Sequence, residues 1–146
     1  MFSYRHQVQF YETDLMGIVH HSNYLRIFEE ARVAWAHAIG LLDYQKPESA
    51  SHLAVLETQV RHIKPAKFGD VLQVQVQATL RKLYIVFEYK MFRDEELVSE
   101  CRTQHVPLDL QLKLIKPPQL LKSILEKQTW TETWLSSLSE SPKPRL

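Results

Sequence analysis

Residues 10–32 contain the side chains with the clearest potential for chemistry. The stretch reads FYETDLMGIVHHSNYLRIFEEAR, and it places Asp14 and Gly17 just before a helical pattern. The first turn of a helix leaves backbone N–H groups unpaired and carries partial positive charge, so it can hold a carbonyl oxygen that becomes negative. Asp14 would then act on the carbon of that carbonyl. A simple turn is the alternative role for an isolated T-D-x-x-G sequence.

Other reaction classes have weaker support in the sequence. His20 and His21 are adjacent and point apart, and neither usual zinc-binding spacing of histidines occurs, so no metal site is expected. Cys101 lies mid-strand without a thiol-activating motif, which favours a buried apolar role. The absence of a Gly-x-Ser-x-Gly sequence argues against a serine hydrolase. The sequence predicts surface or strand positions for His6, His37, His52 and His105.

The composition fits one domain of 146 residues with a substantial core, since 45% of the residues are apolar and 24% are charged. Eighteen basic and seventeen acidic side chains give a net charge of +1, which argues against a broad nucleic-acid-binding surface. The single cysteine excludes an intrachain disulfide. We find no signal-peptide pattern and no long apolar window, so we expect a cytoplasmic protein without membrane insertion.

The periodicity of apolar residues predicts an antiparallel α+β domain. A strand is expected over residues 5–11, and a long helix over 23–39 with Ser22 or Asn23 as its N-cap and Gly40 at its end. Alternation of apolar and polar residues then predicts four more strands, at residues 53–63, 72–80, 83–91 and 97–106.

The end of the chain is expected to differ from the rest. Pro117 and Pro118 can start a short helix with leucines on one side. From residue 128 onward, three apolar residues at helical spacing precede a Ser- and Pro-containing end: Trp130, Trp134 and Leu138. We therefore expect a domain over residues 1–127 and a docking or frayed tail over 128–146.

The motif around Asp14 continues in a pattern typical of one enzyme family. The matching residues are Asp14, Gly17, Ile18, Val19, His20, His21, Ser22, Asn23, Tyr24, Phe28, Glu29, Glu30, Ala31 and Arg32. A second match follows at residues 64–66 and 68–70. The stretch resembles the signature of the 4-hydroxybenzoyl-CoA thioesterase family, and the resemblance covers roughly residues 4 to 126. It implies a hotdog fold, in which a curved five-stranded antiparallel sheet wraps one long helix.

The resemblance implies hydrolysis of an acyl-CoA thioester. Asp14 would be the nucleophile or the general base, and the sequence leaves both open. The backbone amide of His21 would polarise the thioester carbonyl, and Gly17 would let the loop pass close to the substrate. Further substrate contacts are expected from the residues that follow, His20, Asn23 and Tyr24.

Coenzyme A carries phosphates, and one local basic cluster suits them: Arg61, His62, Lys64 and Lys67. Ordinary solvated charges at a strand end explain this cluster equally well. Arg81 and Lys82 are a weaker second candidate. Coenzyme A would be part of the substrate, so no cofactor is expected. The family also implies a homodimer or a dimer of dimers, that is, a homotetramer, with the site at the subunit interface.

Three alternatives stay open at this point. The catalytic acid could lie on the helix at Glu29 or Glu30, although both fit solvated helix charges better. A hydratase or dehydratase would pair Asp14 with His20 or His21, and a non-catalytic thioester-binding module would keep only the fold.

The sequence also leaves the substrate open. The acyl group could be naphthoyl, benzoyl or short aliphatic. The thiol could belong to coenzyme A or to an acyl carrier protein.

Overall fold

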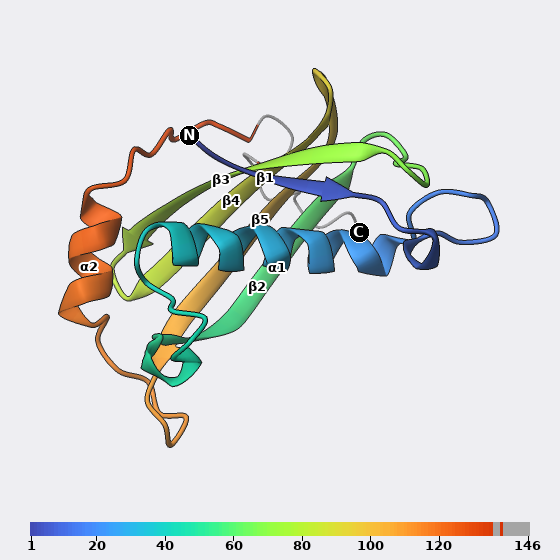
Figure 1. Cartoon of the computed structure of the whole chain (residues 1–146). Helices are drawn as coiled ribbons and strands as arrows, with labels where there is room; N and C mark the ends of the chain where they lie inside the picture. The colour runs from blue at the N-terminus through green and yellow to red at the C-terminus, as the bar shows by residue number, and fades with distance from the viewer. Residues whose placement is uncertain (136–137, 139–146) are drawn as a thin grey trace, which may run out of the picture.

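The computed structural model describes residues 1–135 and 138. It contains a five-stranded antiparallel sheet in the order β1-β3-β4-β5-β2, and helix α1 lies across one face of it (Figure 1). The strands are β1 (Phe2–Gln7), β2 (His52–His62), β3 (Val71–Arg81), β4 (Tyr84–Arg93) and β5 (Glu96–Leu108). The helices are α1 (His21–Ala38), α2 (Gln119–Glu126) and the 3₁₀ turns η1 (Phe10–Glu12) and η2 (Pro47–Ser49). This is the arrangement that the resemblance implies.

The core forms between α1 and the sheet because both carry matching apolar faces. Alternate residues of β3 and β4 are buried, among them Leu72, Val74, Val76, Ile85, Phe87, Tyr89 and Met91. On α1 the buried side chains recur at helical spacing, at Ile27, Phe28, Ala31 and Trp35. Trp35 meets the ring of Phe87 edge-on, with ring centroids 5.2 Å apart. The period-two and 3.6-residue patterns therefore fix which faces meet.

The first strand lies earlier in the chain than the expected residues 5–11. It ends at Gln7, and Phe10 and Tyr11 lie in η1 with 75% and 80% of their surface exposed. The alternation at Val8 and Phe10 suggested a strand. In the described part of the chain, however, β1 pairs only with β3, whose first residue, Val71, faces Gln7. The chain therefore leaves the sheet where its partner strand begins.

The N-cap of α1 is His20, and not Ser22 or Asn23 as expected. The His20 Nδ1 atom accepts a hydrogen bond from the Ser22 backbone N–H at 3.2 Å, so the imidazole takes the role usual for Ser, Thr, Asp or Asn. The other end agrees with the prediction, since Gly40 follows the helix with a φ of 86°. No helix in the described part of the chain is long and apolar enough to cross a membrane.

The chain after α2 packs on the face of the sheet that points away from α1. The side-chain amide of Gln77 donates to the Thr131 carbonyl at 3.0 Å and accepts from the Thr131 N–H at 3.1 Å. Residues 128–135 form no helix, so the spacing of Trp130 and Trp134 does not reflect one. Residues 136–137 and 139–146 lie outside the described residues, and with them the expected frayed end. The buried Leu121 and Leu125 confirm the apolar side of α2.

A line of hydrogen-bonded polar groups crosses the core beneath α1. Arg32 donates to the Tyr89 hydroxyl at 3.2 Å, and that hydroxyl meets Thr103 Oγ1 at 2.8 Å. His105 Nε2 bonds the same Oγ1 at 2.9 Å, while its Nδ1 has no partner in the described part of the chain. Burial, with a smaller effect of the Arg32 charge, lowers the pKa of His105 to about 4. The His105 ring is therefore neutral at pH 7.

We predict that His105 makes folding acid-sensitive. The unfolded chain binds a proton at His105 below about pH 6.5, the ordinary pKa of histidine. The folded chain binds that proton only below about pH 4. Stability is thus lost as the pH falls through this window, by roughly 3 kcal/mol in total. Urea unfolding at both pH limits should show this loss reduced in His105→Leu. An identical pH dependence of the two proteins would contradict the prediction.

Candidate active site

Asp14 lies in a closed loop between η1 and α1. Thr13 and Val19 form a β-bridge across the loop, and the Asp14 N–H donates to the Ile18 carbonyl at 2.9 Å. The Gly17 N–H turns back to the Asp14 carbonyl at 3.0 Å. Gly17 has a φ of 78°, a conformation that residues with a side chain rarely adopt. The glycine of the motif is therefore required by the turn that presents Asp14.

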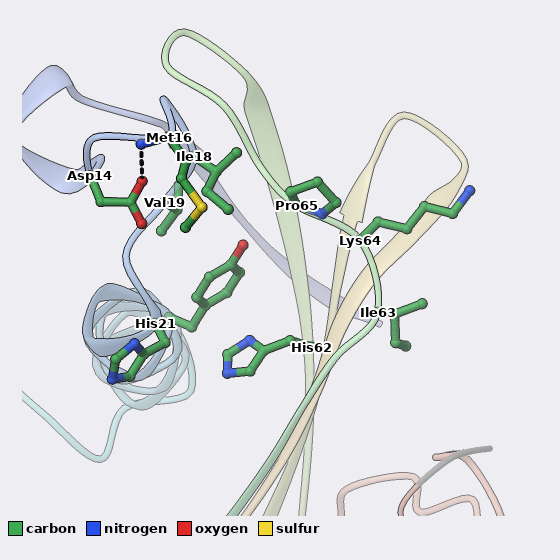
Figure 2. A pocket seen from close by; sticks show the side chains of 10 residues that line it. Asp14, Met16, Ile18, Val19, His21, His62, Ile63, Lys64 and Pro65 are labelled. Atoms are coloured by element: carbon green, nitrogen blue, oxygen red, sulfur yellow. Dashed lines mark hydrogen bonds between the residues drawn. The ribbon is translucent and has the colours of Figure 1, made fainter.

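The Asp14 side chain faces a cleft of about 320 Å³ between the start of α1 and the chain that follows β2 (Figure 2). Its Oδ1 atom accepts a hydrogen bond from the Met16 N–H at 2.8 Å, which fixes the direction of the carboxylate. The cleft is lined by Asp14, Met16, Ile18, Val19, His21, Tyr24, His62, Ile63, Lys64 and Pro65. One carboxylate thus lies in a largely apolar wall.

His21, the first residue of α1, lines the same cleft as Asp14. The N–H groups of Ser22 and Asn23 both donate to His20, to Nδ1 at 3.2 Å and to the carbonyl at 2.9 Å. Within the described residues, the N–H of His21 has no acceptor. Because this amide opens the helix, the positive end of the helix dipole adds to its attraction for a negative oxygen.

Two aromatic side chains form the floor of the cleft. Tyr24 is buried, and its hydroxyl accepts from the Ala66 N–H at 3.3 Å. Burial raises the pKa of Tyr24, although this hydrogen bond opposes the shift. The His62 ring meets Tyr24 edge-on at 4.7 Å, and burial, with the His21 ring second, lowers the pKa of His62. Both rings are therefore uncharged at pH 7.

The structure brings only part of the expected basic cluster to the cleft. His62 and Lys64 line it, but the Lys64 ammonium pairs with Glu96 at 3.0 Å. Arg61 and Lys67 are exposed and do not line the cleft. The weaker candidates Arg81 and Lys82 line a separate pocket on the outer face of the sheet. Any phosphate contact from Arg61 or Lys67 would lie outside the cleft.

His20 and Asn23 support the site from behind and do not line the cleft. Asn23 is buried, and its Nδ2 atom donates to the Glu12 carbonyl at 2.8 Å. The same carbonyl accepts from the His20 N–H at 2.9 Å. The His20 ring bonds Ser22, so no His20–Asp14 pair of the kind expected for a hydratase is formed. Sequence reasoning missed the role of Glu12. Its only signal in the sequence was an acidic side chain two residues before Asp14.

Glu29 and Glu30 point away from the cleft, as expected for helix surface charges. Glu29 lies 3.9 Å from Arg32, and Glu30 contacts Tyr4 and His6. Cys101 is buried in the core, and burial raises the pKa of its thiol, which confirms the predicted apolar role. Across residues 1–135, we find no group of three His, Cys, Asp or Glu side chains that could hold a metal ion.

The chain is similar to known proteins over most of its length. Residues 8–128 match the model of the thioesterase-like superfamily. An Aquifex aeolicus protein of solved structure is 32% identical and superimposes with a TM-score of 0.79, covering 86% of this chain and 99% of that one. An acyl-CoA thioesterase of Haemophilus influenzae is 26% identical, and the match covers 84% of this chain and 92% of that protein. A 1,4-dihydroxy-2-naphthoyl-CoA hydrolase of Synechococcus elongatus is 25% identical, with 86% and 95% covered.

The fold and the site thus define a class, the hotdog-fold thioester hydrolases. Within that class, the chain belongs to the thioesterase-like superfamily, whose model spans α1, strands β2 to β5 and α2.

We predict that Asn23→Ala lowers stability by about 1 kcal/mol, because it removes one hydrogen bond to a buried carbonyl that keeps a second donor. Leu25→Ala, at an exposed position of the same helix, is the control. Thermal unfolding of the two variants checks the prediction. An Asn23→Ala protein as stable as its control would show that the Glu12 carbonyl does not depend on this side chain.

Proposed function

We propose that the protein hydrolyses acyl-CoA thioesters to the free acid and coenzyme A. The observation that supports this most strongly is that Asp14 lines one cleft together with His21, whose backbone N–H has no acceptor among the described residues. A thioester carbonyl held by that N–H would present its carbon to Asp14. The acyl-CoA thioesterases named among the relatives support the same substrate class.

Two reaction routes are open to the Asp14 carboxylate and the His21 N–H. In the first, a carboxylate oxygen of Asp14 bonds the thioester carbon, the C–S bond breaks, and the thiolate leaves and takes a proton from water. Water then cleaves the resulting mixed anhydride. In the second, Asp14 removes a proton from water as that water attacks the same carbon. The C–S bond then breaks, and the leaving thiolate takes the proton from Asp14. In both routes the His21 N–H stabilises the negative charge on the carbonyl oxygen.

The lining of the cleft favours a small acyl group. Its volume of about 320 Å³ is at the lower end for ligand pockets. Met16, Ile18 and Ile63 offer apolar contacts, and Tyr24 offers an aromatic ring. A small aromatic or short-chain acyl group fits this lining, and the naphthoyl-CoA hydrolase among the relatives is consistent with an aromatic one.

We also propose that the working form is a homodimer or a dimer of dimers, in the cytoplasm. Strand β2 lies at an edge of the sheet, and its Val55 and Leu56 are exposed. A long, exposed edge strand with apolar side chains invites pairing with a second copy. The cleft lies where β2 ends, so a partner at this edge would also border the site.

We expect Asp14→Asn to lower kcat at least about 100-fold, since an amide cannot serve as nucleophile or base. Asp43→Asn is a matched control, because Asp43 accepts from the Gln45 N–H at 2.9 Å just as Asp14 accepts from Met16. A panel of aromatic and aliphatic acyl-CoAs, assayed by thiol release, measures both variants and identifies the acyl group.

Near-normal turnover by Asp14→Asn would refute the role of Asp14. Activity lost instead in Glu29→Gln or Glu30→Gln would move the catalytic acid to the helix. Hydration of an enoyl-CoA without release of thiol would favour a hydratase. Tight binding of acyl-CoA without any turnover would indicate a binding module.

A phosphate contact from Lys67 is expected to affect binding and not chemistry. Lys67→Gln should raise KM about fivefold at low salt and leave kcat unchanged, since an exposed ion pair contributes about 1 kcal/mol. The effect should shrink at high salt. Lys113→Gln, an exposed lysine elsewhere, is the control. Equal KM values for both variants would show that Lys67 does not contact the substrate.

A further inference from the structure

His6 on β1 lies between two carboxylates from different elements. Its Nε2 atom is 2.8 Å and 3.0 Å from the two carboxylate oxygens of Glu12 in η1. Its Nδ1 atom is 3.1 Å from Oε2 of Glu30 in α1. The His6 side chain is only 11% exposed, so water competes little for these contacts. The ring therefore connects the end of β1, the turn before Asp14 and the middle of α1.

The two contacts differ in kind. The Nε2 atom is within hydrogen-bonding distance of both Glu12 oxygens, whereas the Nδ1 atom makes a close contact with the Glu30 carboxylate. Because the Glu12 carboxylate is nearly inaccessible to water, loss of the His6 ring would leave part of its hydrogen-bonding capacity unsatisfied.

Glu12 transmits this connection to the site. Its side chain is 6% exposed and also accepts from the Gln9 N–H at 2.7 Å. Its backbone carbonyl accepts from the N–H of His20 and from the Asn23 side chain. Asp14 follows two residues later, and the His21 N–H lies next to His20. A shift of Glu12 would therefore change the distance between the carboxylate and the amide that share the cleft.

We propose that His6 is a positioning residue for the reaction. It ties Glu12 to Glu30 and so holds Asp14 and the His21 N–H in their working geometry. The inference rests on the proposed function of these two groups. It follows that loss of the His6 ring lowers kcat, while KM changes little.

The other residues next to His6 do not make the same link. Tyr4, on the same strand, donates its hydroxyl to Glu30 at 2.9 Å. From β3, the residue paired with His6 is Leu72, which has no polar side-chain group. Among the described residues, His6 is therefore the side chain that contacts both carboxylates.

The test measures kcat, KM and thermal unfolding of His6→Gln in the full chain. The Gln amide has a single donor nitrogen and cannot contact Glu12 and Glu30 from two sides as the ring does, so kcat should fall roughly tenfold and KM should stay within about twofold. Arg5→Gln, at the exposed neighbour on β1, is the control and should keep both values.

A folded His6→Gln protein with the kcat and KM of the Arg5→Gln control would overturn the proposal. The two proposals fail separately. If Asp14→Asn retains turnover, the proposed function fails. If Asp14→Asn is inactive and His6→Gln matches its control, only the role of His6 fails.

Discussion

The arrangement of the site depends on one backbone carbonyl, that of Glu12. It accepts hydrogen bonds from the His20 N–H and from the Asn23 side chain, and so joins the turn after β1 to the first residues of α1. A buried carbonyl with two donors resists displacement, because moving it would leave polar groups unpaired away from water. The Asp14 loop and the helix start are therefore fixed relative to each other by the same atom.

Most of the fold could be predicted because it follows from local periodicity. The alternation from Leu72 to Leu80 and the helical spacing from Tyr24 to Trp35 each need only neighbouring residues to be read. The two errors in the strand and helix boundaries arose where a distant strand or an unusual side chain determines where the element ends or begins. The end of β1 is set by the start of β3, and the cap of α1 is an imidazole, which rarely takes this role.

The same distinction applies to the site. Asp14, Gly17 and His21 could be located because the motif is contiguous in sequence. The opposite wall, from His62 to Pro65, comes from the end of β2 and the residues that follow it, far from Asp14 in sequence, and only its basic residues were singled out from the sequence. The contact of His6 with Glu12 and Glu30 joins three separate elements, and no spacing rule links them.

The charges around the cleft suit a reactive carboxylate. A cation close to Asp14 would form an ion pair with it and make it a weaker nucleophile or base. Burial keeps His62 uncharged, and Glu96 pairs with the Lys64 ammonium, so neither offers a free positive charge to Asp14. The positive potential comes instead from the helix start, where an N–H can hold a carbonyl oxygen. A backbone donor of this kind stabilises charge that develops on the substrate and leaves the carboxylate free to react.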